Sequence, residues 1–415
     1  VGGGVLLGGS SALINNEVYE NRAKDGGGVA TGMCDPTLTG NSIHHNEADA
    51  SGGGLHVYQM GGTISENTIE ENDADRGGGI CVLYSDGAIT GNDILSNTAG
   101  TDDGGGLYVD NSAITLSDNT IRGNVADDGS AGGVKLEGEG TDDATVADNE
   151  IAHNEANWVG AGIFINDSHP AVTDNWIHHN TGNEGSGITV QDSESLISGN
   201  TIEHNSAYWR SGALAYFGSG GTLSANVIRD NDARWHAGAI RLEDSDPTLI
   251  NNAVIDNDVT NGGDSGILID SSMPTFLHNS IAGNTSGSGY GLYLQSGGSV
   301  VTLTNNIVAT QTTGIRVEGG GSVLVDGALW YGNVDNTDGD GTITVLNEHI
   351  GDPLFASDGY HLMEGSAAID AGVVTDVTTD VDGYPRPQGS GFDIGADEYG
   401  QSHMIFLPLV IRSAP

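Results

Sequence analysis

A six-residue segment, Asn-x-Ile-x-x-Asn, recurs about every 26 residues through most of the chain. The first Asn of its eleven copies falls at Asn16, Asn41, Asn67, Asn92, Asn119, Asn149, Asn175, Asn200, Asn226, Asn252 and Asn279. Such regular spacing is typical of repeat architectures, in which each unit buries its apolar residues against its neighbours. We therefore expect a stack of similar units, so the length of 415 residues does not by itself set a number of globular domains.

Each repeat contains three short apolar stretches separated by turn residues. One follows a glycine-rich corner, as in Gly106-Leu107-Tyr108-Val109, where side chains alternate between inward and outward positions. Short strands of this kind must stack on copies of themselves. We therefore predict an all-β fold, a right-handed parallel β-helix of about 13 coils with a small C-terminal capping region. We expect the β-helix at residues 1–346, a C-terminal domain at 347–400 and an apolar tail at 401–415.

The Asn and Gly columns have a structural explanation. An Asn at a tight corner tolerates a left-handed backbone and can hydrogen-bond the equivalent amide of the next coil, which gives a ladder along the stack. Triple glycines, such as the one ending at Gly106, suit corners that need a positive φ or a close backbone approach. They do not indicate a phosphate-binding loop, because no helical pattern and no P-loop Lys follows them.

Composition excludes several classes of partner. The formal net charge is −45, so nucleic acid and anionic membrane surfaces would be repelled along most of the molecule. No run of about 18 apolar residues exists, and we expect no transmembrane segment. We expect the fold to need no cofactor, because stacked Ile, Val and Leu columns supply continuous burial. Scarce Lys, abundant Asp and only two Cys favour an exported bacterial protein.

The repeats and the region after them resemble known families. GAI at 238–240 and the recurring IxxN are similar to repeats of polymorphic outer-membrane adhesins. The later motifs resemble the choice-of-anchor Q domain: DPLF at 352–355, GSAAIDAG at 365–372, DVDG at 380–383, PRP at 385–387 and DIGADE at 393–398. Ala367 replaces that family's usual Pro. The resemblance implies a secreted protein at a bacterial cell surface, and it says little about activity because the same coil serves lyases, hydrolases, adhesins and rods.

The best catalytic candidates lie on outward positions after the glycine corner. Asp110, Lys135 and Glu137, with Asn166 nearby, fall within about three coils. They could bind a cation and a uronic acid, or abstract a proton. The alternative is a solvated face with an incidental salt bridge.

Two further groups are candidate metal ligands. His153, His179 and His204 should stack about 4.8 Å apart at the end of successive motifs, and the alternative is an exposed polar column. A segment rich in oxygen ligands contains Asp335, Asp338 and Asp340, which we predict as a weak Ca²⁺ site in a loop.

Aromatic residues gather in one turn beside the glycine corner. Trp158, Trp209 with Tyr208, and Trp235 are flanked by basic residues, whereas in earlier coils the same turn is acidic, as at Asp103. Exposed rings on a polar rod bind sugars by stacking or anchor a protein interface. The alternative is that these rings pack on one another over a long turn.

The two ends of the chain suggest assembly into a homopolymer. Val1 and Val5 belong to a regular coil that we expect to be uncapped. The tail is the most apolar stretch and contains Ile405, Phe406, Leu407, Leu409, Val410 and Ile411. It could fold back, be a sorting remnant, or pair with the first coil of the next subunit and so build a filament. Deletion of residues 403–415 should then give soluble monomers.

Two classes of function remain open. One is a non-catalytic surface protein, a structural rod or an adhesin, with a glycan or cell-surface partner. The other is a polysaccharide lyase or glycoside hydrolase acting on an extracellular glycan. The first is favoured, because no outward column concentrates an acid, a base and a substrate-binding set.

Overall fold

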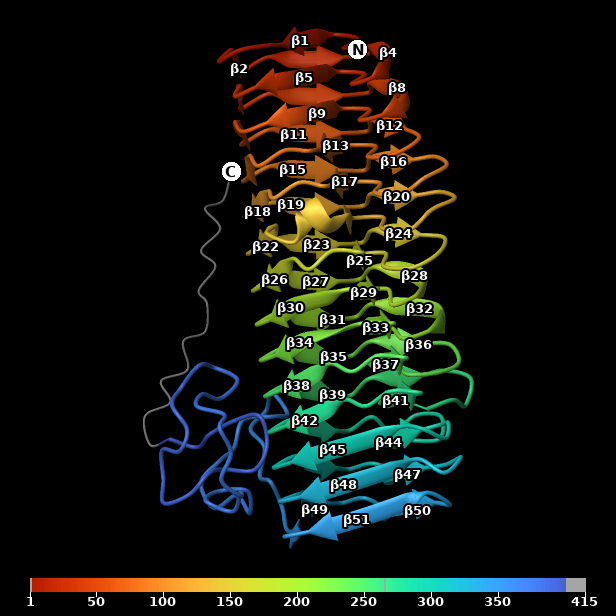
Figure 1. Ribbon diagram of the computed structural model, residues 1–415, viewed down its shortest axis with the longest axis vertical. Helices are drawn as coiled ribbons and strands as arrows, with labels where there is room; N and C mark the ends of the chain where they lie inside the picture. The colour runs from red at the N-terminus through yellow and green to blue at the C-terminus, as the bar shows by residue number, and fades with distance from the viewer. Residues whose placement is uncertain (1, 265, 401–415) are drawn as a thin grey trace.

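The chain winds into a long stack of parallel β-coils in the computed structural model, which describes residues 2–264 and 266–400 (Figure 1). Three sheets hold 14 strands each, and a fourth holds 10. Sheet A runs from β1 (Val5–Leu7) to β50 (Asp335–Gly339), sheet B from β2 (Ala12–Ile14) to β51 (Thr342–Leu346), sheet C from β3 (Glu17–Tyr19) to β52 (His349–Ile350), and sheet D from β4 (Arg22–Asp25) to β40 (Asp258–Val259). The prediction of an all-β parallel solenoid of about 13 coils is confirmed.

Sheet D corrects the expectation of three strands per coil. In ten coils a further short strand follows the Asn motif, such as β24 (Glu155–Ala156), β28 (Thr181–Glu184) and β32 (Ser206–Arg210). Several of these strands have only two residues, which is too short for an alternating pattern to be visible in the sequence. They form because the coils are already aligned by the other three sheets.

The core is a continuous series of stacked apolar side chains. The central Ile of each motif points inward, and Ile151, Ile177 and Ile202 of neighbouring coils pair in register and are fully buried. One hydrophobic cluster extends from Leu7 to Trp330. The inward assignment made from the repeat is confirmed.

Asparagine ladders run along the stack, as predicted. The backbone N–H of Asn154 donates to Oδ1 of Asn180 at 2.9 Å, and its side-chain Nδ2 donates to the same atom at 3.0 Å. The left-handed residue, however, is the one immediately before the ladder Asn, as at His153 and His179, where φ is 54°. The ladder amides therefore sit inside the corner, while the residue before each of them turns the chain.

One outward column of sheet A is covered rather than solvated. The residues of this column from Cys81 through Phe164 to Leu268 are almost fully buried, because the turn from sheet D folds back over them. A Cβ added to Gly160, which has φ +60°, would lie 2.7 Å from Cβ of Phe164. Glycine at this corner therefore permits a close approach that buries a second layer of side chains.

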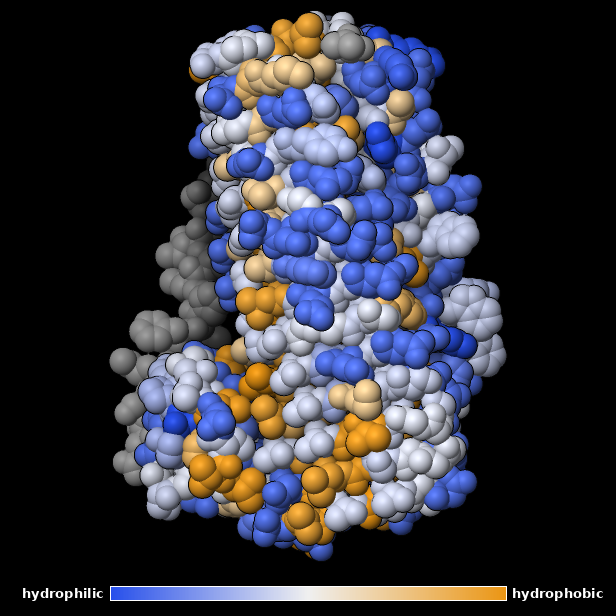
Figure 2. All heavy atoms as spheres, viewed as in Figure 1, coloured by the Kyte–Doolittle hydropathy of each residue, from blue (hydrophilic) through white to orange (hydrophobic). Residues whose placement is uncertain are grey.

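Residues 351–400 contain isolated bridges but no strand, and they lie against the flank of the last coils (Figure 1). They contact sheet C and the corner between sheets B and C, where Asn251, His278 and Asn305 occupy left-handed positions. Nδ2 of Asn251 donates to the Thr379 carbonyl at 2.7 Å, and Nδ2 of Asn305 donates to the Val373 carbonyl at 2.7 Å. Polar residues dominate the upper part of the visible face, and apolar ones gather over the last coils (Figure 2).

Of the residues that the structure describes, none form a helix with the length and apolar character needed to cross a bilayer. The helical content of these residues is a single 3-10 turn, η1 (Glu139–Thr141).

Candidate functional site

Two of the catalytic candidates, Lys135 and Glu137, form a partly buried ion pair, and Asp110 lies beside them. Asp110 ends β17 (Leu107–Asp110) and pairs in register with Glu137 of β21 (Val134–Glu137). Lys135 is only 3% exposed. Its ammonium lies 3.1 Å from Asp103 Oδ2 and 3.9 Å from Glu137 Oε2, and 3.5 Å from the centre of the Phe164 ring. Lys135 is thus held by two carboxylates and the face of an aromatic ring.

This placement corrects the expectation of a solvated face. Tyr108 adds a hydrogen bond from its hydroxyl to Glu137 Oε2 at 3.0 Å. Burial, followed by the nearby charge of Glu137, raises the pKa of Tyr108 and of Asp110. Asp103 was not predicted from the sequence as the partner of Lys135. The acidic residues of its turn indicated a possible partner for a cation, but only the fold brings that turn over sheet A.

The predicted Ca²⁺ loop is in fact strand β50. Thr337 pairs with the buried Ile315, and Asp338 pairs with Arg316, which faces outward. Alternation along the strand therefore places Asp335 and Asp338 on opposite faces. Asp338 forms an ion pair with Arg316, and Asp340 accepts the backbone N–H of Gly319 at 3.1 Å. The three carboxylates do not converge on one point.

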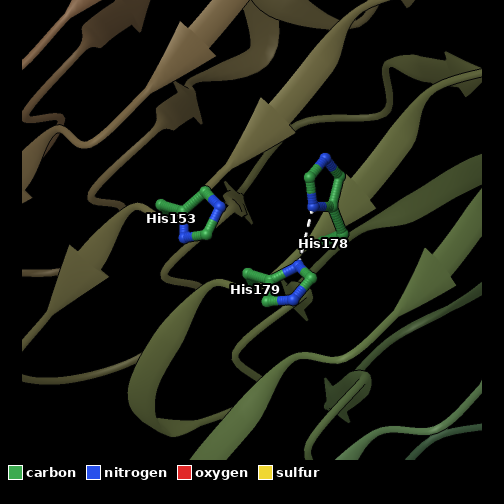
Figure 3. A group of neighbouring side chains, drawn as sticks. All are labelled: His153, His178 and His179. Atoms are coloured by element: carbon green, nitrogen blue, oxygen red, sulfur yellow. Dashed lines mark hydrogen bonds between the residues drawn. The ribbon is translucent and has the colours of Figure 1, made fainter.

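The histidine column forms as predicted, with one additional member. The ring of His179 lies between those of His153 and His204, at centroid distances of 4.9 and 5.1 Å. His178, at the end of β27 (Trp176–His178), joins them with Nδ1 2.9 Å from Nδ1 of His179 (Figure 3). Side-chain donors of His153, His178 and His179 all lie within 4.8 Å of one another. His178 was missed because strand alternation alone does not show that two consecutive imidazoles turn toward each other.

The aromatic turn forms an exposed edge of the rod, which we call the aromatic edge: Trp158, Tyr208, Trp209 and Trp235. Their exposed fractions are 59, 57, 51 and 37%. The alternative in which the rings bury one another does not hold. Trp209 and Trp235 are neighbours, with ring centroids 6.3 Å apart, yet both keep a large surface open to solvent. The edge follows sheet D, where loops protrude from the coils (Figure 1).

The backbone of the aromatic edge is held by hydrogen bonds between coils. The N–H of Trp235 donates to the carbonyl of Trp209 at 3.0 Å, and the N–H of Asn183 donates to the carbonyl of Trp158 at 3.1 Å. The Arg234 guanidinium lies over the Tyr208 ring, 4.7 Å from its centre, and 5.7 Å from that of Trp235. The rings are thus presented on a fixed scaffold with a cation among them.

Comparison with a family model agrees with the parallel β-coils. Residues 3–156, 53–208 and 161–329 match the family described as right handed beta helix region. The chain belongs to the right-handed β-helix family. Among solved structures, it is similar to a crystal structure of pectate lyase Pel9A, with 10% sequence identity and a TM-score of 0.41, over 95% of this chain and 98% of that one. No curated protein matches the chain.

A second polar group of this β-helix protein lies in the C-terminal segment and was not predicted. His361 lies between two carboxylates, with Nδ1 2.9 Å from Asp358 Oδ2 and Nε2 2.6 Å from Asp382 Oδ2. Burial opposes the charge of His361, but these hydrogen bonds outweigh it and raise the pKa of the imidazole to about 10. His361 is therefore a cation in an acidic setting at neutral pH, which disfavours it as a metal ligand.

The predicted assembly residues fall largely beyond what the structure describes. Val1 and the tail residues Ile405, Phe406, Leu407, Leu409, Val410 and Ile411 lie outside the described residues. Val5 begins β1 and is half-buried against the core. Filament formation through the tail stays a prediction, as does the resemblance of residues 352–398 to the choice-of-anchor Q domain.

Proposed function

We propose that this chain is a non-catalytic binding rod of the bacterial cell surface, whose aromatic edge contacts a glycan. The observation that carries the proposal is the exposure of four aromatic rings, those of Trp158, Tyr208, Trp209 and Trp235, along one edge of the rod. The surface location is inferred from the resemblance of the C-terminal motifs to an anchor domain.

The chemistry of the aromatic edge suits sugar rings. The C–H face of a pyranose is apolar and packs against the face of a Trp or Tyr ring, while its hydroxyls remain free to hydrogen-bond. Arg234, positioned among the rings, can donate to those hydroxyls. Because the scaffold is fixed between coils, little conformational entropy is lost when a ligand orders on it.

A catalytic role for Asp110, Lys135 and Glu137 is less well supported than a binding role for the aromatic edge. A general base needs to reach a substrate proton, and Lys135 is buried, ion-paired with Asp103 and placed over the Phe164 ring. Polyuronates and neutral glycans should be incubated with the protein while unsaturated products and reducing ends are monitored. If the protein cleaves one of these glycans and Lys135→Met abolishes the cleavage, the chain is a polysaccharide lyase or hydrolase. The proposal of a non-catalytic binding rod would then be wrong.

The direct test is binding to a panel of neutral and acidic glycans immobilised on a surface. In the double variant Trp209→Ala/Trp235→Ala, affinity for the best ligand should fall at least about tenfold, since central aromatic anchors dominate such contacts. Tyr84→Ala is the matched control, because Tyr84 is 53% exposed and lies in a different turn. Equal losses in both variants, or no binding across the panel, would refute a glycan-contact role for this edge.

A further inference from the structure

Three imidazoles face one another on the outer surface of two successive coils (Figure 3). The two Nδ1 atoms of His178 and His179 are 2.9 Å apart, and the ring of His153 stacks on that of His179 with an interplanar angle of 22°. In a hydrogen bond between two Nδ1 atoms, one nitrogen must be the acceptor. The two Nδ1 atoms therefore point toward each other, and an ion that replaces this hydrogen bond would meet the lone pairs of both rings once each keeps its proton on Nε2.

The backbone fixes this arrangement. His153 and His179 occupy equivalent left-handed corners of adjacent coils, both with φ 54°. Each is followed by a rung of the Asn ladder, and Asn154 is bonded to Asn180 through both its backbone and its side chain. The donors are thus brought together before any ion arrives, which is what a tight site requires.

A carboxylate supports His178 from behind. His178 is 5% exposed and stacks on Trp176 with ring centroids 3.8 Å apart. Oε1 of Glu150 lies 3.5 Å from its Nε2, which makes no hydrogen bond. A carboxylate on this side of the ring favours the tautomer with its proton on Nε2, and that tautomer presents the Nδ1 lone pair toward His179, as in histidine ligands of metal sites.

We propose that His153, His178 and His179 bind one divalent transition-metal ion of the zinc class. Three imidazole nitrogens suit Zn²⁺ or Cu²⁺, whereas Ca²⁺ and Mg²⁺ prefer oxygen ligands. His153 and His179 are exposed, so the ion reaches the site from solvent and keeps an open position for water or a further ligand. The site is separate from the aromatic edge and does not depend on the glycan proposal.

The chain contains a two-histidine counterpart that serves as a control. His44 and His45 have the same Nδ1 to Nδ1 distance of 2.9 Å. Their Nε2 atoms, however, face Glu17 at 3.2 Å and Glu71 at 2.6 Å. Among the described residues, this pair is not part of any group of three or more possible metal ligands whose ligand atoms lie within 4.8 Å of one another. It should bind Zn²⁺ more weakly than the three-histidine group.

The test is titration of the metal-free full chain with Zn²⁺ by calorimetry, and with Cu²⁺ by electron paramagnetic resonance. We expect one Zn²⁺ per chain with a Kd below about 100 µM, and coupling of Cu²⁺ to imidazole nitrogens. His153→Ala and His178→Gln should each weaken Zn²⁺ binding at least about tenfold, while His44→Gln should leave it unchanged.

His153 is exposed, so His153→Ala should fold normally even if the buried His178 does not tolerate substitution. A wild-type Kd above about 100 µM overturns the proposal. So does a loss in His44→Gln equal to that in His153→Ala, which would mean that scattered surface histidines hold the ion.

Discussion

The β-helix coils and the C-terminal segment 351–400 are held together by different physical means. In the coils, each residue type recurs in register, so apolar columns and Asn ladders repeat the same contacts along the rod. In the segment, a small apolar cluster against β46 (Ile307–Ala309) and β49 (Leu329–Tyr331) is joined by buried charges. Stability is therefore distributed in the first region and concentrated in a few residues in the second.

The segment is organised around Arg386. Its guanidinium lies 2.9 Å from Glu398 Oε2, with both side chains fully buried, and it also donates to the carbonyls of Gly395 and Ala396 at 2.7 and 2.6 Å. Asp393 accepts the backbone N–H of Asp370 at 2.6 Å. Motifs that are separated in sequence thus meet in one polar network, whereas the strands of each coil pair with those of the adjacent coils.

The largest expected effect is at the buried ion pair. Arg386→Met should destabilise the segment by about 3 to 5 kcal/mol, because Glu398 is left as a buried charge without its cation. Hydrogen exchange should show faster exchange in residues 351–400 and little change in the coils. Arg386→Met/Glu398→Gln, which removes the charge and keeps an acceptor, should recover part of the loss. If the double variant is as unstable as the single one, the charge is not what organises the segment.

A core substitution tests the distributed stability of the coils. Ile177→Ala should lower the free energy of unfolding by about 2 to 5 kcal/mol, since it leaves a cavity among fully buried side chains. Denaturant unfolding measures this, with the exposed Thr181→Ala as the control, expected within about 0.5 kcal/mol of wild type. A change below about 0.5 kcal/mol in Ile177→Ala would contradict the inward assignment.

The charge of His361 should contribute on the order of 2 kcal/mol to holding the segment. Its pKa is raised from 6.5 to about 10, so this stabilisation is fully present below about pH 6.5 and is lost as the pH rises through about 10. His361→Gln should therefore differ from wild type at neutral pH and converge with it above about pH 10, as followed by limited proteolysis of the segment.

Asp358→Asn is the control for this titration. It removes one of the two carboxylates that hold the imidazolium, so the midpoint of the wild-type transition should move to lower pH. If the midpoint of the pH transition is the same in Asp358→Asn as in wild type, the transition does not depend on the contact between His361 and Asp358.

The smallest effect on stability is expected at the aromatic edge. Trp209→Ala should change the free energy of unfolding by less than about 0.5 kcal/mol, because the ring is half-exposed and packs in neither the core nor the segment. Thermal unfolding measures this. A loss above about 1 kcal/mol would mean that the ring is part of the coil's packing and not a free contact surface.

Much of the fold was predictable because the same pattern of apolar, Asn and Gly residues recurs in each coil and indicates the same local structure each time. The columns of Ile177 and its equivalents, the ladders and the parallel stacking all follow from one 26-residue pattern. The fourth sheet was not predicted, since strands such as β24 have two residues and no pattern of their own. The candidate sites were predicted less well: the aromatic edge is exposed as expected, whereas Lys135 is buried and Asp335 and Asp338 point to opposite faces.

The sequence by itself determined which residues stack, because residues one repeat apart must become neighbours in any solenoid. Only the tertiary structure decided what covers the stack. Three features depend on the paths of turns and of a non-repeating segment: the turn that brings Asp103 to Lys135, the approach of His178 to His179, and the docking of residues 351–400 on His278 and Asn305. Those paths are set by contacts between distant residues, and a periodic pattern contains no information about them.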